Sequence, residues 1–191
     1  MKLGLMGGMF DPIHFGHLRA AENAREALGL DRVAFVPAAV PPHRAAPTAS
    51  AVDRYAMVAL ATASDPRFVP WDGEIRRDGP RYTVDTVEAL LGENPGAALT
   101  LIVGADNFAL LPQWKEPARL LALCTVAVVG RPGEALTETK GLDPARFVHV
   151  EGSHLPIASS ALRERVRAGR SVRYLVPDAV ADYIEKRGLY R

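Results

Sequence analysis

The chain has 191 residues, of which 48% are hydrophobic and 24% are charged, and its formal net charge at pH 7 is +1. This composition is typical of a globular protein with one well-buried core, and the near-zero charge gives no general attraction to nucleic acid or to anionic membranes. The single cysteine, Cys124, excludes an internal disulfide and a cysteine-rich zinc site.

Short apolar runs alternate along the chain with segments of helical periodicity. The predicted strands cover residues 2–6, 33–36, 68–71, 99–103, 125–129 and 147–150. The predicted helices lie near residues 16–28, 51–64 (capped by Ser50), 84–91 and 117–123, and two more begin near Ser159 and Pro177. Such alternation predicts an α/β fold, a Rossmann-like, doubly wound and mainly parallel sheet with helices on both faces.

From Pro156 onward the pattern is helical only. We therefore expect one domain over residues 1–191, with an α/β core in 1–155 and a helical C-terminal subdomain in 156–191. The long segments 37–48 and 130–143 are predicted loops. The first is rich in proline and basic residues, which suits a loop that closes over a substrate, although a mobile connection is an equal interpretation.

The most informative segment is 7–18, with the sequence GGMFDPIHFGHL, which predicts a tight turn between the first strand and the first helix. His14 and His17 lie at the start of that helix, where free backbone N–H groups and the helix dipole favour a phosphate. Zinc binding is disfavoured because no acidic or cysteine partner lies at helical spacing, and the two histidines could also merely cap or pack. The chain has neither a Walker A loop nor the Gly-x-Gly-x-x-Gly spacing of a dinucleotide fold.

The motif Gly8-x-Phe10-Asp11-Pro12-x-His14-x-Gly16-His17 resembles the H-x-G-H signature of the nucleotidyltransferase superfamily. Within it, the chain closely resembles the bacterial nicotinate-nucleotide adenylyltransferase family. Segments 36–44, 81–86, 102–106, 111–114, 157–163 and 171–177 carry the rest of that resemblance. The chain departs from the family at Met9 and Ala158, where a hydroxyl is usual, and at Arg44, where lysine is common.

The resemblance implies that the adenylyl group of ATP is transferred to nicotinate mononucleotide, giving nicotinate adenine dinucleotide and pyrophosphate in NAD biosynthesis. It implies His14, His17 and Arg163 as catalytic residues, with Mg²⁺ accompanying ATP and no protein metal ligand assigned. The implied ATP-binding residues are Gly8, Met9, Phe10, Gly16, Gly104, Asp106, Ser159 and Ser160. The implied mononucleotide-binding residues are His43, Arg44, Tyr82, Thr83, Trp114 and Arg131.

Taken alone, several of these residues have a purely structural interpretation. The Phe10 side chain and Trp114 could fill the core, and Asp106 could cap a short following helix. Arg163 could be a solvated side chain on a helix capped by Ser159 or Ser160.

Two other functions remain open. The acceptor could instead be nicotinamide mononucleotide or phosphopantetheine, although the 81–86 segment and Trp114 favour a pyridine ring. The chain could also be a non-catalytic nucleotide sensor, against which the presence of both His14 and His17 counts. We expect no nucleic-acid or membrane partner and a cytoplasmic location, because no signal peptide or membrane span is present, and we leave homo-oligomerisation open.

Overall fold

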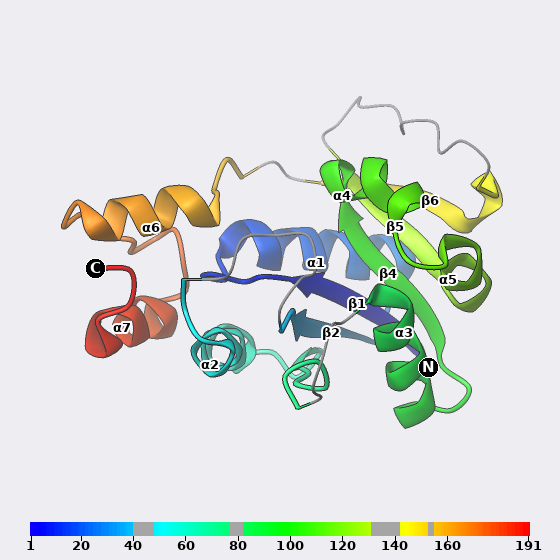
Figure 1. Ribbon diagram of the computed structural model, residues 1–191, viewed down its shortest axis with the longest axis horizontal. Coiled ribbons are helices and arrows are strands. Elements are labelled where there is room, and N and C mark those ends of the chain that lie inside the picture. The colour runs from blue at the N-terminus through cyan, green and yellow to red at the C-terminus, as the bar shows by residue number, and fades with distance from the viewer. Residues whose placement is uncertain (40–47, 77–81, 131–141, 153–154) are drawn as a thin grey trace.

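The computed structural model describes residues 1–39, 48–76, 82–130, 142–152 and 155–191 (Figure 1). Over these residues the chain forms a six-stranded sheet of order β3-β2-β1-β4-β5-β6, and every neighbouring pair is parallel. The strands are β1 (Lys2–Gly8), β2 (Arg32–Pro37), β3 (Phe68–Pro70), β4 (Ala98–Gly104), β5 (Thr125–Gly130) and β6 (Phe147–Glu151). All six predicted strands are thus confirmed.

The helices of the described residues are α1 (Phe15–Leu28), α2 (Ala51–Thr62), α3 (Thr83–Glu93), α4 (Ala105–Leu110), α5 (Pro117–Leu123), α6 (Ser159–Arg167) and α7 (Asp178–Arg187). Two short 3₁₀ helices span Leu111–Gln113 and Pro144–Arg146. Ser50 caps α2 as predicted, since its hydroxyl accepts a hydrogen bond from the Asp53 backbone N–H. None of the helices in the described segments has the length and apolar character needed to cross a bilayer.

The sheet separates two hydrophobic cores because side chains alternate along each strand. In β2, Val33 and Phe35 point into one core, whereas Ala34 and Val36 point into the other. Residues of α1, α2, α6 and α7 complete the first core, and residues of α3, α4 and α5 complete the second. The prediction of a doubly wound sheet with helices on both faces is therefore confirmed.

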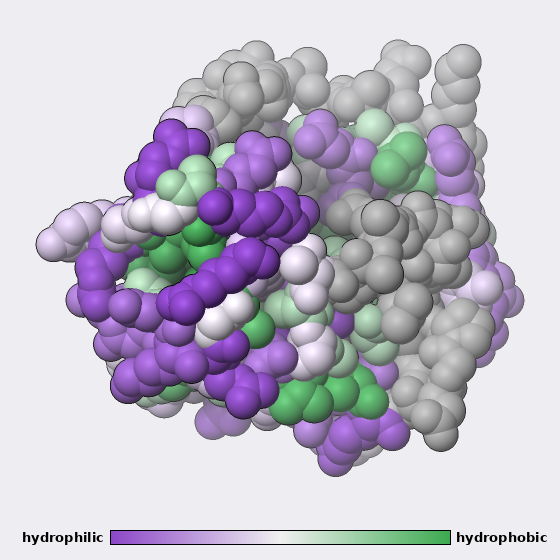
Figure 2. All heavy atoms as spheres, turned by 60° about the vertical axis from the view of Figure 1, so that its left-hand side comes forward, coloured by the Kyte–Doolittle hydropathy of each residue, from purple (hydrophilic) through white to green (hydrophobic). Residues whose placement is uncertain are grey.

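The two C-terminal helices both contribute to the first core, and α7 packs against α2. The Tyr183 hydroxyl of α7 donates to the Asp53 carboxylate of α2 at 2.9 Å, and Arg187 forms an ion pair with the same carboxylate at 3.2 Å. Figure 1 shows α6 and α7 together at one end of the molecule, and Figure 2 shows that this side is covered mainly by hydrophilic residues.

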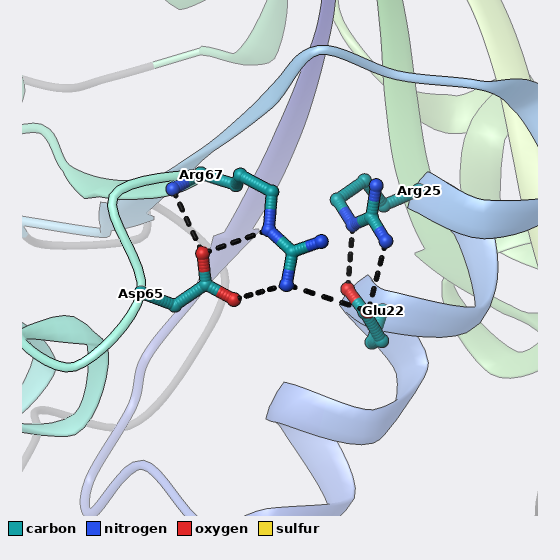
Figure 3. Close-up of polar contacts among 4 residues, drawn as sticks. All are labelled: Glu22, Arg25, Asp65 and Arg67. Carbon is teal, nitrogen blue, oxygen red and sulfur yellow. Dashed lines mark hydrogen bonds and ion pairs between the residues drawn. The ribbon is translucent and has the colours of Figure 1, made fainter.

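A surface network ties α1 to the segment that precedes β3 (Figure 3). Glu22 accepts from Arg25 at 2.7 Å, and Arg67 lies 4.0 Å from Glu22 and 2.6 Å from Asp65. The hydrogen bonds from Arg67 lower the pKa of Asp65 to about 2. Arg67 is partly exposed, and ion pairs made by exposed side chains contribute little individually to stability.

The strand order reverses between β1 and β4, the two central strands. From β1 the chain proceeds to β2 on one side, whereas from β4 it proceeds to β5 on the other. The connections that leave the carboxyl ends of these two strands therefore diverge, which is where open α/β sheets bind ligands.

Candidate functional site

A cleft of about 960 Å³ opens at the carboxyl ends of β1 and β4. Five parts of the chain line it, namely the end of β1 with the β1–α1 loop, the first turns of α1, the end of β4 with the start of α4, Val129 of β5, and the start of α6 with the segment that precedes it. The cleft brings together every residue predicted to be catalytic or to bind ATP: Gly8, Met9, Phe10, His14, Gly16, His17, Gly104, Asp106, Ser159, Ser160 and Arg163.

The two histidines form a stacked pair at the start of α1. Their ring centroids are 3.7 Å apart, and the Phe10 and His17 ring centroids lie 5.1 Å apart in an edge-to-face arrangement. The backbone N–H of His14 donates to Nδ1 of His17 at 3.3 Å, so His17 carries its proton on Nε2 when neutral. Gly16 is required beside them, because a Cβ at that position would lie 2.9 Å from the His14 ring.

Both imidazoles are neutral at pH 7 in the ligand-free protein. Burial lowers the pKa of His14 to about 4, and burial together with the neighbouring His14 charge lowers the pKa of His17 to about 3. Each ring then has one N–H donor and one acceptor nitrogen. A polyphosphate in the cleft would shift both pKa values upward, because it favours the charged form.

Two buried polar atoms at the cleft have no hydrogen-bond partner within the described residues. They are Nδ1 of His14 and Nε of Arg163. Buried polar groups are normally paired, so both atoms are candidates for contact with a ligand. Arg163 is held by its Nη1 atom, which donates to the Asp11 carbonyl at 2.8 Å.

The β1–α1 loop presents its backbone to the cleft and hides its aromatic side chain. Phe10 has a positive φ of 47° and is 1% exposed, which confirms that its side chain belongs to the core. A Cβ on Gly8 would lie 3.1 Å from the Phe10 ring, so the glycine allows this close approach.

The prediction that Ser159 or Ser160 caps α6 is wrong. Ala158 occupies the cap position, and the Ser159 hydroxyl instead donates to the Pro12 carbonyl of the β1–α1 loop at 2.9 Å. No side chain caps the α6 terminus, which leaves its first N–H groups beside the cleft for an anion.

The interpretation of Asp106 as a helix cap is also wrong. Gly104 has the extended backbone of a cap residue and α4 begins immediately after it, which places Asp106 in the first helical turn. Both residues line the cleft, where the carboxylate is available to a ligand.

The predicted mononucleotide-binding residues are only partly described. His43, Arg44 and Arg131 lie outside the described residues. Tyr82 and Thr83 form the start of α3, and Trp114 follows the 3₁₀ helix after α4. Tyr82 and Trp114 are partly buried and pack against the second core, and none of these three lines the cleft, so their ligand contacts stay a prediction.

The sequence analysis missed the buried side chains that hydrogen-bond to the β1–α1 loop. Arg54 of α2 is fully buried and donates to the carbonyls of Met9 at 2.8 Å and Ala39 at 3.1 Å. The Asp11 carboxylate accepts from the Tyr190 hydroxyl at 2.8 Å. An arginine within a helix normally indicates a solvated position, so nothing local in the sequence signals that Arg54 is buried.

Within the described ranges, no group of three or more histidine, cysteine or acidic side chains could hold a metal ion. His14 and His17 therefore have no third such ligand in this part of the chain. The arrangement instead suits an anion, since it combines imidazole N–H groups, a guanidinium and the starts of α1 and α6.

Comparisons with known proteins agree with this geometry. The model of the cytidylyltransferase-like family matches residues 5–165. A protein of Thermus thermophilus named "Probable nicotinate-nucleotide adenylyltransferase" is 49% identical over 191 residues, covering 100% of both chains. One of the same name from Roseiflexus sp. is 46% identical over 199 residues, covering 99% of this chain and 98% of the relative.

A solved structure shares the fold at low sequence identity. Plasmodium falciparum nicotinic acid mononucleotide adenylyltransferase, complexed with NaAD, has a TM-score of 0.76 at 15% identity, covering 99% of this chain and 97% of that one. The match along the whole length of the bacterial relatives settles the family. The chain belongs to the nicotinate-nucleotide adenylyltransferases, within the cytidylyltransferase-like family.

Proposed function

We propose that this enzyme transfers the adenylyl group of ATP to nicotinate mononucleotide, releasing pyrophosphate and forming nicotinate adenine dinucleotide. Family membership supports the reaction class and the acceptor. The observation that carries the proposal for the site is the convergence of His14, His17 and Arg163 on one cleft, where two buried nitrogen atoms have no hydrogen-bond partner among the described residues.

The chemistry needs electrostatic stabilisation more than proton transfer. The 5′-phosphate of the mononucleotide is already an anion when it attacks the α-phosphorus, so no general base is required. Negative charge grows on the α-phosphate and on the leaving pyrophosphate. The imidazole N–H groups would donate to these oxygens, and Arg163 with the start of α6 would hold the β- and γ-phosphates.

The remaining ligand contacts follow from the same assignment. Gly8 and the Met9 and Phe10 backbone would lie along the nucleotide, and Asp106 would accept from its ribose or adenine. Mg²⁺ would enter with ATP and neutralise part of its charge. Magnesium usually keeps several waters and binds substrate phosphates, which fits a cleft without a cluster of protein ligands in the described residues.

The acceptor side is proposed on the family resemblance. Tyr82, Thr83 and Trp114 would bind the pyridine ring and its carboxylate, and His43, Arg44 and Arg131 would bind the mononucleotide phosphate. Most of the 37–48 loop lies outside the described residues, and its closure over the substrates stays a prediction. If the loop closes, the two substrates together should protect it from protease. Equal cleavage of the loop with and without the substrates would argue against closure.

One assay separates the candidate functions. The protein is mixed with ATP, Mg²⁺ and one acceptor at a time, and pyrophosphate is measured. Nicotinate mononucleotide should give the fastest release. Faster release with nicotinamide mononucleotide or phosphopantetheine would replace the acceptor, and ATP binding without release for any acceptor would favour the sensor.

A further inference from the structure

The β1–α1 loop is anchored by a residue from the far end of the sequence. After α7 the backbone turns back through two left-handed positions, Gly188 with φ of 63° and Tyr190 with φ of 66°. This turn buries the Tyr190 side chain, which is 5% exposed, and directs its hydroxyl to Asp11 at 2.8 Å. A non-glycine residue rarely adopts this conformation, so its surroundings must hold it there.

Within the part of the chain that the structure describes, three hydrogen-bond donors reach the Asp11 carboxylate. The backbone N–H groups of Thr48 and Ala49 donate at 2.8 Å and 3.1 Å, and the Tyr190 hydroxyl is the third. Burial, followed by the Asp11 charge, raises the pKa of Tyr190 far above its usual value, so the hydroxyl keeps its proton and remains a donor. A carboxylate that is 4% exposed needs all of these partners.

The Asp11 carboxylate lies near Arg163 but is too far away to accept a hydrogen bond from it. Nη1 of Arg163 is 3.9 Å from Oδ2 of Asp11, and it donates to the Asp11 carbonyl instead, at 2.8 Å. If one of its donors were removed, the Asp11 carboxylate would be under-coordinated beside a guanidinium. The Tyr190 hydroxyl bonds Oδ1, so its loss would leave that oxygen, among the described donors, with the Ala49 N–H alone and free the carboxylate to turn. The buried Arg54 is held by the Met9 and Ala39 carbonyls, so the replacement we expect is a charge-assisted hydrogen bond from Arg163.

We infer that Tyr190 is a positioning residue for adenylyl transfer, whose hydroxyl holds the Asp11 carboxylate away from Arg163 and thereby keeps that guanidinium available to the cleft. The inference rests on the proposed function, because it assigns the effect to phosphate binding by Arg163. It concerns the loop as well, since Asp11 lies three residues before His14.

The test compares Tyr190→Phe with Tyr183→Phe. Both substitutions keep the ring and delete one tyrosine-to-carboxylate hydrogen bond, at 2.8 Å and 2.9 Å respectively, but Tyr183 pairs with Asp53 outside the cleft lining. Y190F should lower kcat by about tenfold to a hundredfold with a much smaller change in KM for ATP, because displacement of a transition-state group by about 1 Å costs this much. Y183F should keep kcat within about twofold, because its carboxylate partner Asp53 does not line the cleft, whereas Asp11, the partner of Tyr190, does.

Two further measurements make the result decisive. Both variants are assayed below their unfolding transitions, with rates normalised to ATP sites counted by equilibrium binding. Imidazole NMR signals of His14 and His17 should shift in Y190F and not in Y183F. Equal kcat values for both variants, or unshifted imidazole signals in Y190F, would overturn the inference. A wild-type protein without pyrophosphate release would instead overturn the proposed function.

Discussion

The stacked histidines should make the protein lose stability within a defined pH window. In the folded chain the pKa values are about 4 for His14 and about 3 for His17, against 6.5 for a free imidazole. Between pH 6.5 and about 4 the unfolded state therefore binds more protons than the folded state, so the free energy of unfolding falls as the pH falls. Well above pH 6.5 both states leave these rings neutral, and this contribution is constant.

The size of the loss follows from the width of the window. Each histidine costs about 1.4 kcal/mol per pH unit inside it, which gives about 2 kcal/mol each, or about 4 kcal/mol for the pair, between pH 7 and pH 5. This is a large part of the roughly 5–15 kcal/mol that stabilises a typical domain. Urea unfolding followed by circular dichroism at the two pH values would measure it.

Substitution of the rings provides the control. His14→Gln and His17→Gln should each remove about half of the pH-dependent loss, because a glutamine amide does not titrate. The doubly substituted protein should lose least between pH 7 and pH 5. A wild-type free energy of unfolding that is the same at both pH values would refute the reasoning, as would an undiminished loss in the doubly substituted protein.

Three further predictions, one of them with a matched control substitution, test the site and the core. His17→Ala should lower kcat by about 100- to 1000-fold and change KM for ATP far less, whereas small equal effects in steady-state kinetics would contradict its role. Trp114→Ala should raise KM for the mononucleotide about fivefold and leave KM for ATP unchanged in the same assay, and the reverse pattern would place Trp114 elsewhere. Gly4→Ala should cost about 1–3 kcal/mol in thermal unfolding, because its Cβ would lie 2.9 Å from Leu30 Cδ1. The matched Gly92→Ala in α3 should instead stabilise by up to about 1 kcal/mol, since nothing lies within 4 Å, so a loss at Gly92 would count against this reasoning.

The sheet and most helices could be predicted because their signals are local. A strand such as β5 is a short apolar run, and α1 has an apolar stripe at helical spacing. The cleft residues from 8 to 17 could be predicted for the same reason, since they all belong to one contiguous motif. The helix α4 was expected only as a short helix after Asp106, because its start is set by the end of β4.

The wrong and missing predictions concern side chains whose hydrogen-bond partner lies far away in the sequence. Ser159 looks like a cap residue, but its hydroxyl bonds the Pro12 carbonyl, 147 residues away. Arg54 and Tyr190 are separated from their partners by 45 and 179 residues, so no local pattern could indicate either contact. The division into residues 1–155 and 156–191 remains our proposal.

The long sequence separation between the β1–α1 loop and its anchors bears on how the protein is made. Ribosomes add about 5–20 residues per second, so Tyr190 follows Asp11 by about 10 to 35 s. During this interval the nascent chain carries a histidine loop that lacks Ser159, Arg163 and Tyr190, which bind it from 147, 152 and 179 residues further on. Binding competence should therefore emerge only after α6 and α7 have been synthesised and have docked, even though the histidine motif leaves the ribosome well before them.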